Sequence, residues 1–376
     1  MTSPPRPPRR PMMLVICPFP VGVAAGQRLK YEQYFDDWRD MGFDIVVSPY
    51  MDKAMWSVAY QPGHYAGKIL GLLRGHLRRI RDLFRIHRYD LTYIHMWVTP
   101  VGTSVFERLV RRLSKRIVFD VEDNVLVGQK LPKGDNPNRL AKLFKGTGKA
   151  RFMIAEADHV VTSSPSLNDE CLAMNRQRAC TYISSSMDCD RFVPVNRDGG
   201  TEDVTIGWTG THSTKMFLDL LRGVFQRLAE RVRFRLRVIG NFDWSLDGVD
   251  LEVVRWSPER EVEDLQALDI GVYPLTFDDW VGGKSGLKAI QYMTLGLPTV
   301  ATNVGTTPRI IRDGENGVLV TTEDEWVDAL ERLVRDPALR RRLGEAARRD
   351  AVAKYSTTAI AADYRHVLAD VMGWSE

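Results

Sequence analysis

The stretch G-G-K-S-G-L-K-A-I-Q-Y-M-T-L-G-L-P-T-V covers residues 282–300 and predicts a glycine-rich loop, a short helix and a buried strand. Ser285 is expected to cap the start of the helix, and Gly296 is expected to end it. Lys284 and Lys288 lie at this helix start, where unpaired backbone N–H groups already carry a partial positive charge and disfavour a cation. A bound anion would make both interactions favourable, so the stretch is a candidate anion site.

Short apolar runs alternate with amphipathic segments on both sides of this stretch. M-L-V-I-C and F-D-I-V-V are two such runs in the first half, and V-T-I-G-W and D-I-G-V-Y-P are two in the second. Helical periods include residues 27–41, 67–87 and 213–230. This alternation predicts an α/β protein with parallel sheets covered by helices on both faces.

The chain is expected to form two doubly wound, Rossmann-like domains that face each other across a cleft, with ligands beyond the carboxyl ends of the strands. The polar, proline- and glycine-containing segment around residues 190–201 marks the break between them. The expected divisions are a disordered lead at residues 1–11, an N-terminal domain at 12–188, a linker at 189–203, a C-terminal domain at 204–355, and a final helix at 356–376 that crosses back to the N-terminal domain.

Composition excludes several classes of function. The 376 residues carry a net charge of +4, which gives no indication of nucleic-acid binding, and no apolar run is long enough to cross a membrane. The four cysteines form no C-x-x-C pair, so no metal site is expected and a reducing, cytoplasmic location fits.

Two further loops join a strand to a helix in the way that phosphate-binding loops do. The first is P-F-P-V-G-V-A-A-G, where Gly22 and the following Arg28 are the candidate residues; an ordinary turn is the alternative reading. The second is W-T-G-T-H-S-T-K, where the amides of Gly210 and Thr211 with Lys215 are candidates to hold a diphosphate; a capped helix with an exposed lysine is the alternative. Trp256, at a strand end, is a candidate to face a nucleobase, although tryptophans usually pack in the core.

Two strand ends of the first half carry side chains that suit sugar or acceptor chemistry. Asp120 ends the run R-I-V-F-D, and His95 ends Y-I-H. Asp120 is expected to point into the cleft; His95 either faces the cleft or is a structural histidine, which is the usual role of a lone histidine at such a position. The D-x-D formed by Asp188 and Asp190 lies at the interdomain break and is discounted as a metal site.

The segment from Lys68 to Arg88 is strongly basic and amphipathic. Its cations are opposed by a single acid, Asp82, and its apolar residues fall on one helical stripe, namely Ile69, Leu72, Leu73, Leu77, Ile80 and Phe84. One interpretation packs this stripe on the sheet. The other places the helix against an anionic surface, such as a membrane leaflet that bears a lipid-linked phosphate, at the inner membrane face.

The run G-L-K-A-I-Q-Y-M-T-L-G-L-P-T-V-A-T-N-V-G-T-T-P-R-I-I-R-D-G-E-N-G-V-L-V, residues 286–320, resembles the donor-binding signature of glycosyltransferase family four, a retaining family of GT-B fold. I-G-W-T-G-T-H-S-T-K resembles a phosphate loop of one subgroup, and M-D-C-D-R-F-V-P resembles the family's interdomain motif. The resemblance covers most of residues 204–355, and the first half matches only in layout.

The resemblance implies transfer of a sugar from a nucleoside-diphosphate donor to an acceptor hydroxyl, without metal or further cofactor, in polysaccharide or glycolipid biosynthesis. The family's E-x(7)-E glutamates align with Gly283 and Gln291, and Gln291 would hold the ribose through hydrogen bonds without charge. Asp120 takes the place of a histidine common in the family, and Arg309 that of a glutamate. The alternatives are a sugar-nucleotide epimerase of related architecture and a non-catalytic subunit that keeps the fold.

Overall fold

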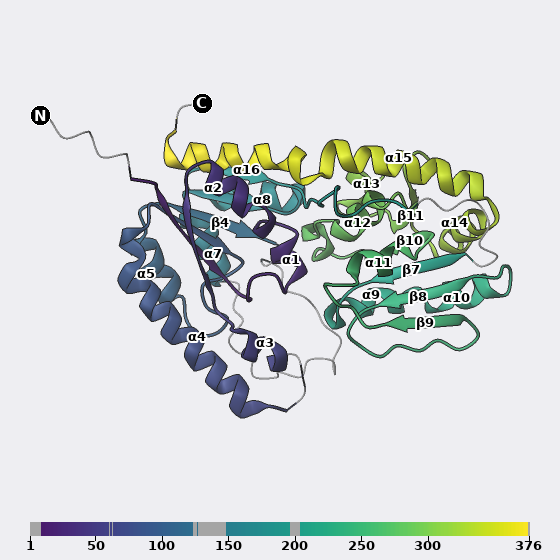
Figure 1. Ribbon diagram of the computed structural model, residues 1–376, viewed down its shortest axis with the longest axis horizontal. Coiled ribbons are helices and arrows are strands. Elements are labelled where there is room, and N and C mark those ends of the chain that lie inside the picture. Colours follow the sequence, from purple (N-terminus) through teal and green to yellow (C-terminus); the bar gives the residue numbers. More distant parts are fainter. Residues whose placement is uncertain are drawn as a thin grey trace, which may run out of the picture. The chain divides into compact units, whose positions relative to one another are not determined.

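The computed structural model describes residues 9–59, 61, 63–122, 126, 148–195 and 204–374. The chain divides into an N-terminal unit, Met1–Ile183 with Ala361–Glu376, and a C-terminal unit, Ser184–Ile360. Each unit contains a six-stranded sheet with helices on both faces (Figure 1). The two predicted doubly wound sheets are confirmed.

The N-terminal sheet has the order β2-β1-β3-β4-β5-β6, and all neighbouring strands are parallel. Its strands are β1 (Met12–Cys17), β2 (Asp44–Pro49), β3 (Leu91–His95), β4 (Ile117–Val121), β5 (His159–Thr162) and β6 (Cys180–Tyr182). The chain goes from β1 to β2 on one side and then returns to place β3 on the other side of β1. The carboxyl ends of β1 and β3 therefore form the switch point at which such sheets bind ligands.

The N-terminal helices are α1 (Ala25–Arg28), η1 (Glu32–Tyr34), α2 (Phe35–Asp40), α3 (Lys53–Ala59), α4 (Tyr65–Arg85), η2 (Ile86–Arg88), α5 (Val105–Leu113), α7 (Gly148–Glu156) and α8 (Pro165–Met174). The prediction of one helix over residues 27–41 is wrong, because the helical conformation is interrupted between α1 and η1. The break turns the consecutive residues Lys30 and Tyr31 inward together, Lys30 to a buried carboxylate and Tyr31 to the ring of His95.

Helix α4 packs on the unit with a face that is small and polar. Gly71 and Gly75 lie on this face, and a Cβ atom at Gly75 would come within 2.5 Å of the Tyr50 ring. Arg79 and Asp82 are buried beside them. The interpretation that packs the apolar stripe on the sheet is therefore wrong, since glycine-mediated close approach and a buried ion pair occupy the contact face and leave the stripe outside.

The C-terminal sheet has the order β12-β11-β10-β7-β8-β9 and is also parallel throughout. Its strands are β7 (Thr205–Thr209), β8 (Arg235–Ile239), β9 (Asp250–Val254), β10 (Ile270–Tyr273), β11 (Thr299–Thr302) and β12 (Val318–Val320). This is the strand order of dinucleotide-binding sheets, and its switch point lies between β7 and β10.

The C-terminal helices are η3 (His212–Thr214), α9 (Lys215–Asp219), α10 (Arg222–Ala229), α11 (Glu261–Gln266), η4 (Val281–Gly283), α12 (Leu287–Thr294), α13 (Thr307–Ile310), α14 (Glu323–Arg335) and α15 (Pro337–Tyr355). The helix predicted at 213–230 is three shorter helices. Their turns place Phe217 against Trp280, with nearly parallel rings whose centroids are 6.1 Å apart.

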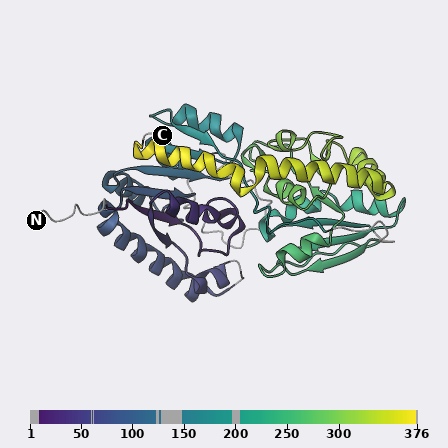
Figure 2. The same cartoon turned by 45° about the horizontal axis from the view of Figure 1, so that its top comes forward.

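Two segments join the units in sequence. Residues 184–195 belong to the C-terminal unit, where the Arg348 guanidinium donates hydrogen bonds to the carbonyls of Cys189 and Phe192. The last helix, α16 (Thr357–Met372), lies from Ala361 onward along the N-terminal unit (Figures 1 and 2). There its Tyr364 packs on Tyr34, with ring centroids 4.8 Å apart.

Candidate functional site

The switch point of the C-terminal sheet gathers most of the predicted anion-binding residues. Strand β7 leads into the loop that begins at Gly210, and β10 leads into the loop that contains Trp280 and Lys284. Because β7 and β10 are neighbours, both loops leave the same edge of the sheet side by side. The W-T-G-T-H-S-T-K loop and the G-G-K-S-G loop therefore leave the C-terminal sheet at the same edge.

Gly210 permits the chain to turn tightly after β7. A Cβ atom here would lie 2.2 Å from the Trp208 ring and 2.6 Å from Thr214 Oγ1, so any larger residue would displace the loop. Beyond it, Thr211 and Thr214 form a reciprocal capping box, in which the Thr211 N–H donates to Thr214 Oγ1 at 3.0 Å. Lys215 follows, half-buried, as the first residue of α9.

Lys288 lies between the ends of the two central strands. Its Nζ is 5.9 Å from the ring centroid of Trp208 on β7 and 5.7 Å from that of Tyr273 on β10. The lysine is in the first turn of α12, so its charge adds to the partial positive charge of the helix start. Its ammonium group therefore lies at the switch point near two aromatic rings, whose faces attract a cation.

Lys284 is not on the helix, which corrects the predicted stripe of Lys284, Lys288 and Gln291. The residue is extended and follows η4, and α12 begins three residues later. Its Nζ lies 3.9 Å from the Trp280 ring centroid, and its carbonyl accepts a hydrogen bond from the Thr306 hydroxyl at 2.6 Å. Lys284 therefore belongs to the loop after β10, whereas Lys288 belongs to α12.

Ser285 is not the helix cap either. Gly286 occupies the cap position with a φ of +74°, and Ser285 is buried before it. A Cβ atom at Gly286 would also meet the terminal methyl of Ile310, a flexible side chain that can move, so it is mainly the backbone conformation that favours glycine. The N–H groups at the start of α12 accordingly have no side-chain cap.

The two residues predicted to bind ribose or base lie at different distances from this centre. Gln291 is one turn beyond Lys288 on α12 and is buried. Trp256 follows β9, which is separated from β7 by the whole of β8, so it lies two strands from the switch point. The sheet order favours Gln291 over Trp256 as a neighbour of a ligand bound between β7 and β10.

In the N-terminal unit, Asp120 and His95 come together in a buried polar cluster. Asp120 is fully buried, and its carboxylate accepts hydrogen bonds from the Lys30 ammonium and from the Tyr93 hydroxyl at 2.7 Å. The same carboxylate lies 3.3 Å from His95 Nδ1. Three groups thus converge on one carboxylate at the ends of β3 and β4.

Electrostatics keep this carboxylate ionised. Burial alone raises the pKa of Asp120, but the charge of Lys30 and the hydrogen bond with His95 outweigh it and lower the pKa to about 2. Burial, together with the neighbouring Asp120 charge, raises the pKa of Tyr93 well above its ordinary value, so Tyr93 remains a hydrogen-bond donor.

Both side chains are at most 1% exposed, so the expectation that Asp120 points into open space is not met, and His95 fits the alternative of a structural histidine. Glu122, two residues after Asp120, is the acid that reaches the surface at this edge. Its side chain is 15% exposed, its carboxylate is 3.9 Å from His95 Nε2, and a Cβ atom at Gly26 would meet it at 2.4 Å. Glu122 therefore lies between the buried cluster and α1, the helix that follows the loop after β1.

The loop after β1 contains the candidate Gly22, and α1 contains the candidate Arg28. Gly22 is exposed with a φ of +82°, and its N–H donates to the Glu32 carboxylate at 2.8 Å. Burial raises the pKa of Glu32, against the opposing effect of this hydrogen bond. The Gly22 amide is thus occupied by an acid of the protein itself, which weakens its case as an anion ligand; Arg28, half-buried on α1, stays a candidate.

Comparison with known proteins identifies the family. Residues 203–336 match the model for "Glycosyl transferases group 1". A D-inositol 3-phosphate glycosyltransferase from an Arthrobacter species is 39% identical over 312 residues, which cover 74% of this chain and 70% of that protein. The chain belongs to the group 1, family-four glycosyltransferases.

Solved structures agree with this assignment at the level of the fold. Sucrose-phosphate synthase from Thermosynechococcus elongatus superposes with a TM-score of 0.70 at 15% identity, over 98% of this chain and all of that one. Anabaena HepE, solved in complex with UDP-glucose, superposes with a TM-score of 0.68 at 14% identity, over 96% and 99% of the two chains. The predicted GT-B architecture of this glycosyltransferase is confirmed.

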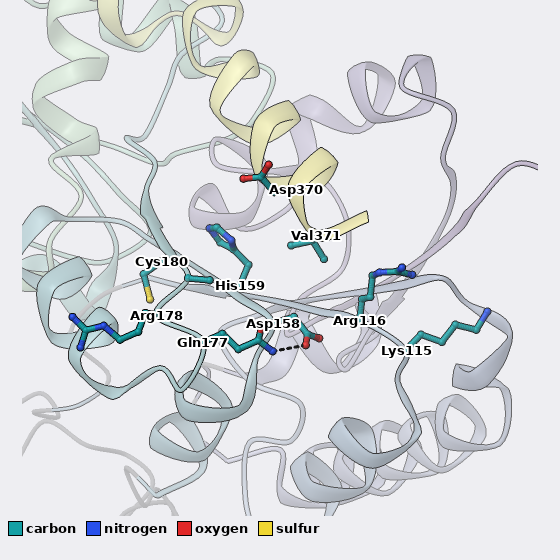
Figure 3. A pocket seen from close by; sticks show the side chains of 10 residues that line it. Lys115, Arg116, Asp158, His159, Gln177, Arg178, Cys180, Asp370 and Val371 are labelled. Carbon is teal, nitrogen blue, oxygen red and sulfur yellow. Dashed lines mark hydrogen bonds between the residues drawn. The ribbon is translucent and has the colours of Figure 1, made fainter. Parts of the chain in front are cut away.

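One open hollow of the glycosyltransferase lies away from both switch points. It has a volume of about 870 Å³ and is lined by residues that include Arg116, His159 and Arg178 (Figure 3). Arg116 precedes β4, and His159 begins β5, so the hollow is at the amino ends of the N-terminal strands. Ligands of doubly wound sheets bind at the opposite, carboxyl edge.

Sequence reasoning missed Lys30 and Trp280, and within the acidic run F-D-V-E-D it chose Asp120 rather than Glu122. Lys30 lies in a segment with a helical period, where a lysine is ordinarily solvated, and no local pattern marks a partner 90 positions away. Both acids belong to the same short run at the end of β4. Only the three-dimensional structure shows that Asp120 is buried and that Glu122 is partly exposed. Trp280, two residues before the opening stretch, had no signal beyond its proximity to Lys284.

Proposed function

We propose that this protein is a retaining glycosyltransferase that moves a hexosyl group from a nucleoside-diphosphate sugar to an acceptor hydroxyl of a glycan, a lipid-linked sugar or a small molecule. The observation that carries the proposal is the placement of Lys288 at the switch point between β7 and β10, with Lys284 on the adjoining loop. Two ammonium groups beside an uncapped helix start suit a diphosphate.

On the donor side, negative charge builds on the diphosphate as the bond to the sugar breaks. Lys284, Lys288 and Lys215 would stabilise this charge, each charge-assisted hydrogen bond contributing about 1.5–3 kcal/mol. The predicted amides of Gly210 and Thr211 are left out, because they already donate to the Ile239 carbonyl and to Thr214 Oγ1, both at 3.0 Å. The three lysines supply the positive charge that a metal supplies in other transferases, so we propose that neither a metal nor a further cofactor takes part. Gln291 would bind the ribose.

Retention follows if both bond changes occur on one face of the sugar. The bond from the anomeric carbon to the diphosphate oxygen breaks, the acceptor oxygen bonds to the same carbon from the same side, and the acceptor proton passes to the departing phosphate oxygen. No protein nucleophile is needed. The absence of a glutamate at Gly283 is compatible with this route, because the leaving group itself acts as the base.

The N-terminal cluster would act on the acceptor side. Because Asp120 and His95 are buried, we propose that they are positioning residues rather than groups in contact with substrate. Asp120 fixes the orientation of the His95 ring, and His95 in turn lies beside Glu122, which reaches the surface. Glu122 is then the candidate to hold an acceptor hydroxyl.

A turnover experiment with the full chain tests the proposal. UDP-glucose is the first donor probe, and UDP release is measured alone and with an inositol phosphate, an oligosaccharide and a glycolipid as acceptors. Acceptor-dependent release of UDP, with the product in the donor's anomeric configuration, is the expected result. Conversion of the nucleotide sugar without an acceptor would indicate an epimerase instead.

The changes at Gly283 and Gln291 also favour a second candidate, a subunit that binds nucleotide sugar without turnover. The same experiment separates the two. The non-catalytic subunit would be supported if the protein binds UDP-glucose saturably but releases no UDP with any acceptor of the panel. The corresponding GDP, ADP and dTDP sugars should then also release no nucleoside diphosphate. A cytoplasmic location remains a prediction for either function.

A further inference from the structure

Helix α4 exposes a continuous apolar face directly opposite the face that packs on the protein. Seven large side chains on this helix are between 41% and 77% exposed: Tyr65, Ile69, Leu70, Leu73, Leu77, Ile80 and Phe84. At 100° per residue, the stripe from Ile69 to Phe84 is centred about 180° from the buried line of Gly71, Gly75, Arg79 and Asp82. The stripe therefore points straight out of the N-terminal unit.

The neighbouring helix α5 continues this surface. His76 of α4 and Phe106 of α5 have ring centroids 5.6 Å apart, which places the two helices side by side at the outer edge of the unit (Figure 1). α5 exposes Val105, Leu109 and Leu113, which follow one another at intervals of one helical turn. Contiguous apolar patches of this extent mark sites of interaction on soluble proteins.

The exposed charges on both helices are positive. The sole acid of α4, Asp82, is buried against Arg79 and Arg85, and the sole acid of α5, Glu107, is buried against Thr99. The exposed cations are Arg74 and Arg81 along one border of the α4 stripe, and Arg108 and Arg112 on α5. Burial has thus removed every carboxylate of these two helices from the outer face.

We infer that the outer face of α4 and α5 binds an anionic lipid bilayer. An apolar stripe with arginines along its border matches a bilayer surface, where acyl chains lie beneath a layer of negatively charged headgroups. A second copy of the chain fits less well, because a symmetric contact through α4 would bring arginine against arginine. The helix would lie in the interface, since no helix of the described residues is long and apolar enough to cross a membrane.

This inference does not depend on the transfer reaction. With about 1.5 Å of rise per residue, α4 extends over roughly 30 Å, long enough to present Ile69 and Phe84 to one bilayer surface together. The face belongs wholly to the N-terminal unit, whereas the nucleotide site belongs to the C-terminal unit. Lipid binding and nucleotide binding can therefore be tested by separate variants.

Co-sedimentation of the full chain with vesicles tests the inference. Vesicles of phosphatidylcholine alone are compared with an equal mixture of phosphatidylcholine and phosphatidylglycerol. We expect binding to the mixed vesicles, weakened by salt, and little binding to the neutral ones. Arg74→Gln with Arg81→Gln should lower the partition coefficient about fivefold per arginine, and Leu73→Ser with Leu77→Ser should lower it about tenfold or more.

Matched controls lie on the C-terminal unit. Leu220→Ser with Val352→Ser removes two exposed apolar residues, and Arg332→Gln with Arg341→Gln removes two exposed cations. Both controls should bind mixed vesicles like the wild type, and all four variants should keep the thermal shift with UDP. Since the substituted side chains are exposed, a circular-dichroism melt should show that every variant is folded.

Three results would overturn the inference. The first is that the wild type fails to bind the mixed vesicles at low salt. The second is that the α4 variants bind as well as the C-terminal controls. The third is a stable dimer in light scattering that the Leu73→Ser, Leu77→Ser variant converts to a monomer, because the face would then be a contact between copies.

Discussion

Asp120 shows how a single buried carboxylate organises the N-terminal strand ends. Its hydrogen bonds with Lys30 and Tyr93 offset the cost of removing two charges from water. The arrangement is demanding, because removal of one partner leaves the other charge buried and uncompensated. The protonation of Asp120 therefore affects both the stability of the fold and the orientation of the His95 ring.

We predict that this pair makes the protein sensitive to acid. The folded pKa of Asp120, about 2, is below the ordinary value of 3.8, so the unfolded chain takes up this proton first as the pH falls. The stabilisation is complete above the ordinary pKa and is lost as the pH falls through about 2, and it amounts to about 2 kcal/mol. Urea unfolding of Asp120→Asn at neutral pH should show a loss of about 3–5 kcal/mol, with less further loss on acidification than the wild type.

Asp36 offers the control, since its side chain is 94% exposed and pairs only at the surface with Arg39. Asp36→Asn should unfold like the wild type at every pH. Equal acid sensitivity in Asp120→Asn and the wild type would mean that another group determines it.

At the scale of the residue, the sequence predicted candidate anion-binding residues better than it predicted which side chains contact each other. Lys288 was predicted from its position at a helix start and Gly210 from its position after a strand, and the structure places both beside Trp208. Lys30 was missed, because its partner is brought near by the sheet and not by the local chain. Whether a side chain is solvated or buried against a distant acid depends on tertiary contacts that a local period does not contain.

At the scale of the element, the tight turn after β7 determines where the phosphate loop begins. We predict that Gly210→Ala displaces this loop, because the new methyl group would meet the Trp208 ring and Thr214 Oγ1 well inside contact distance. The expected result is weaker binding of UDP and a loss of about 1–3 kcal/mol in the free energy of unfolding. Calorimetry and urea unfolding measure the two effects.

Gly223 is the matched control on α10, since a Cβ atom there would meet nothing within 4 Å. Gly223→Ala should leave UDP binding unchanged and stabilise the helix by up to about 1 kcal/mol. If both alanine variants bind UDP equally well, the loop after β7 does not hold the diphosphate.

The sequence predicted more reliably that a helix exists than which of its faces is buried. The 21-residue helix α4 was expected from its period, yet the same period fits a stripe that is buried and a stripe that is exposed. Gly71 and Gly75 were the residues that decided the outcome, because glycines at this spacing allow a close backbone approach that larger side chains prevent. Helix breaks, such as those near Lys30 and Leu220, depend on which side chains the core accepts and cannot be read from periodicity.

At the scale of the whole molecule, alternation of apolar strands and helices was enough to predict two parallel sheets. Parallel strands buried on both faces leave continuous apolar runs, and β1 and β10 have this pattern. The boundary between the units was harder to predict from the sequence. Residues 184–195 belong to the C-terminal unit, where they contact Arg348, which comes more than 150 residues later.

The last helix provides a prediction at this scale. Tyr364 is buried in the N-terminal unit against Tyr34 and Trp38, so Tyr364→Ala should destabilise that unit by about 3–5 kcal/mol. Calorimetry should show a lower Tm for one transition, with the UDP-stabilised transition unchanged. Tyr65→Ala, at a largely exposed position of the same unit, should change neither. An equal decrease of both transitions in Tyr364→Ala would contradict the assignment of this helix.

The central claim is that Lys284 and Lys288 hold the diphosphate of a nucleotide sugar. The direct measurement is the thermal shift and binding isotherm of the full chain with UDP, GDP, ADP and dTDP, for the wild type, for Lys284→Ala with Lys288→Ala, and for the exposed control Lys354→Ala. We predict that at least one nucleotide stabilises the wild type and the control alike, and that the double variant, still folded, binds it about 100-fold or more weakly. If no nucleotide stabilises the wild type, or if the double variant binds as the control does, the donor site is not where these lysines lie.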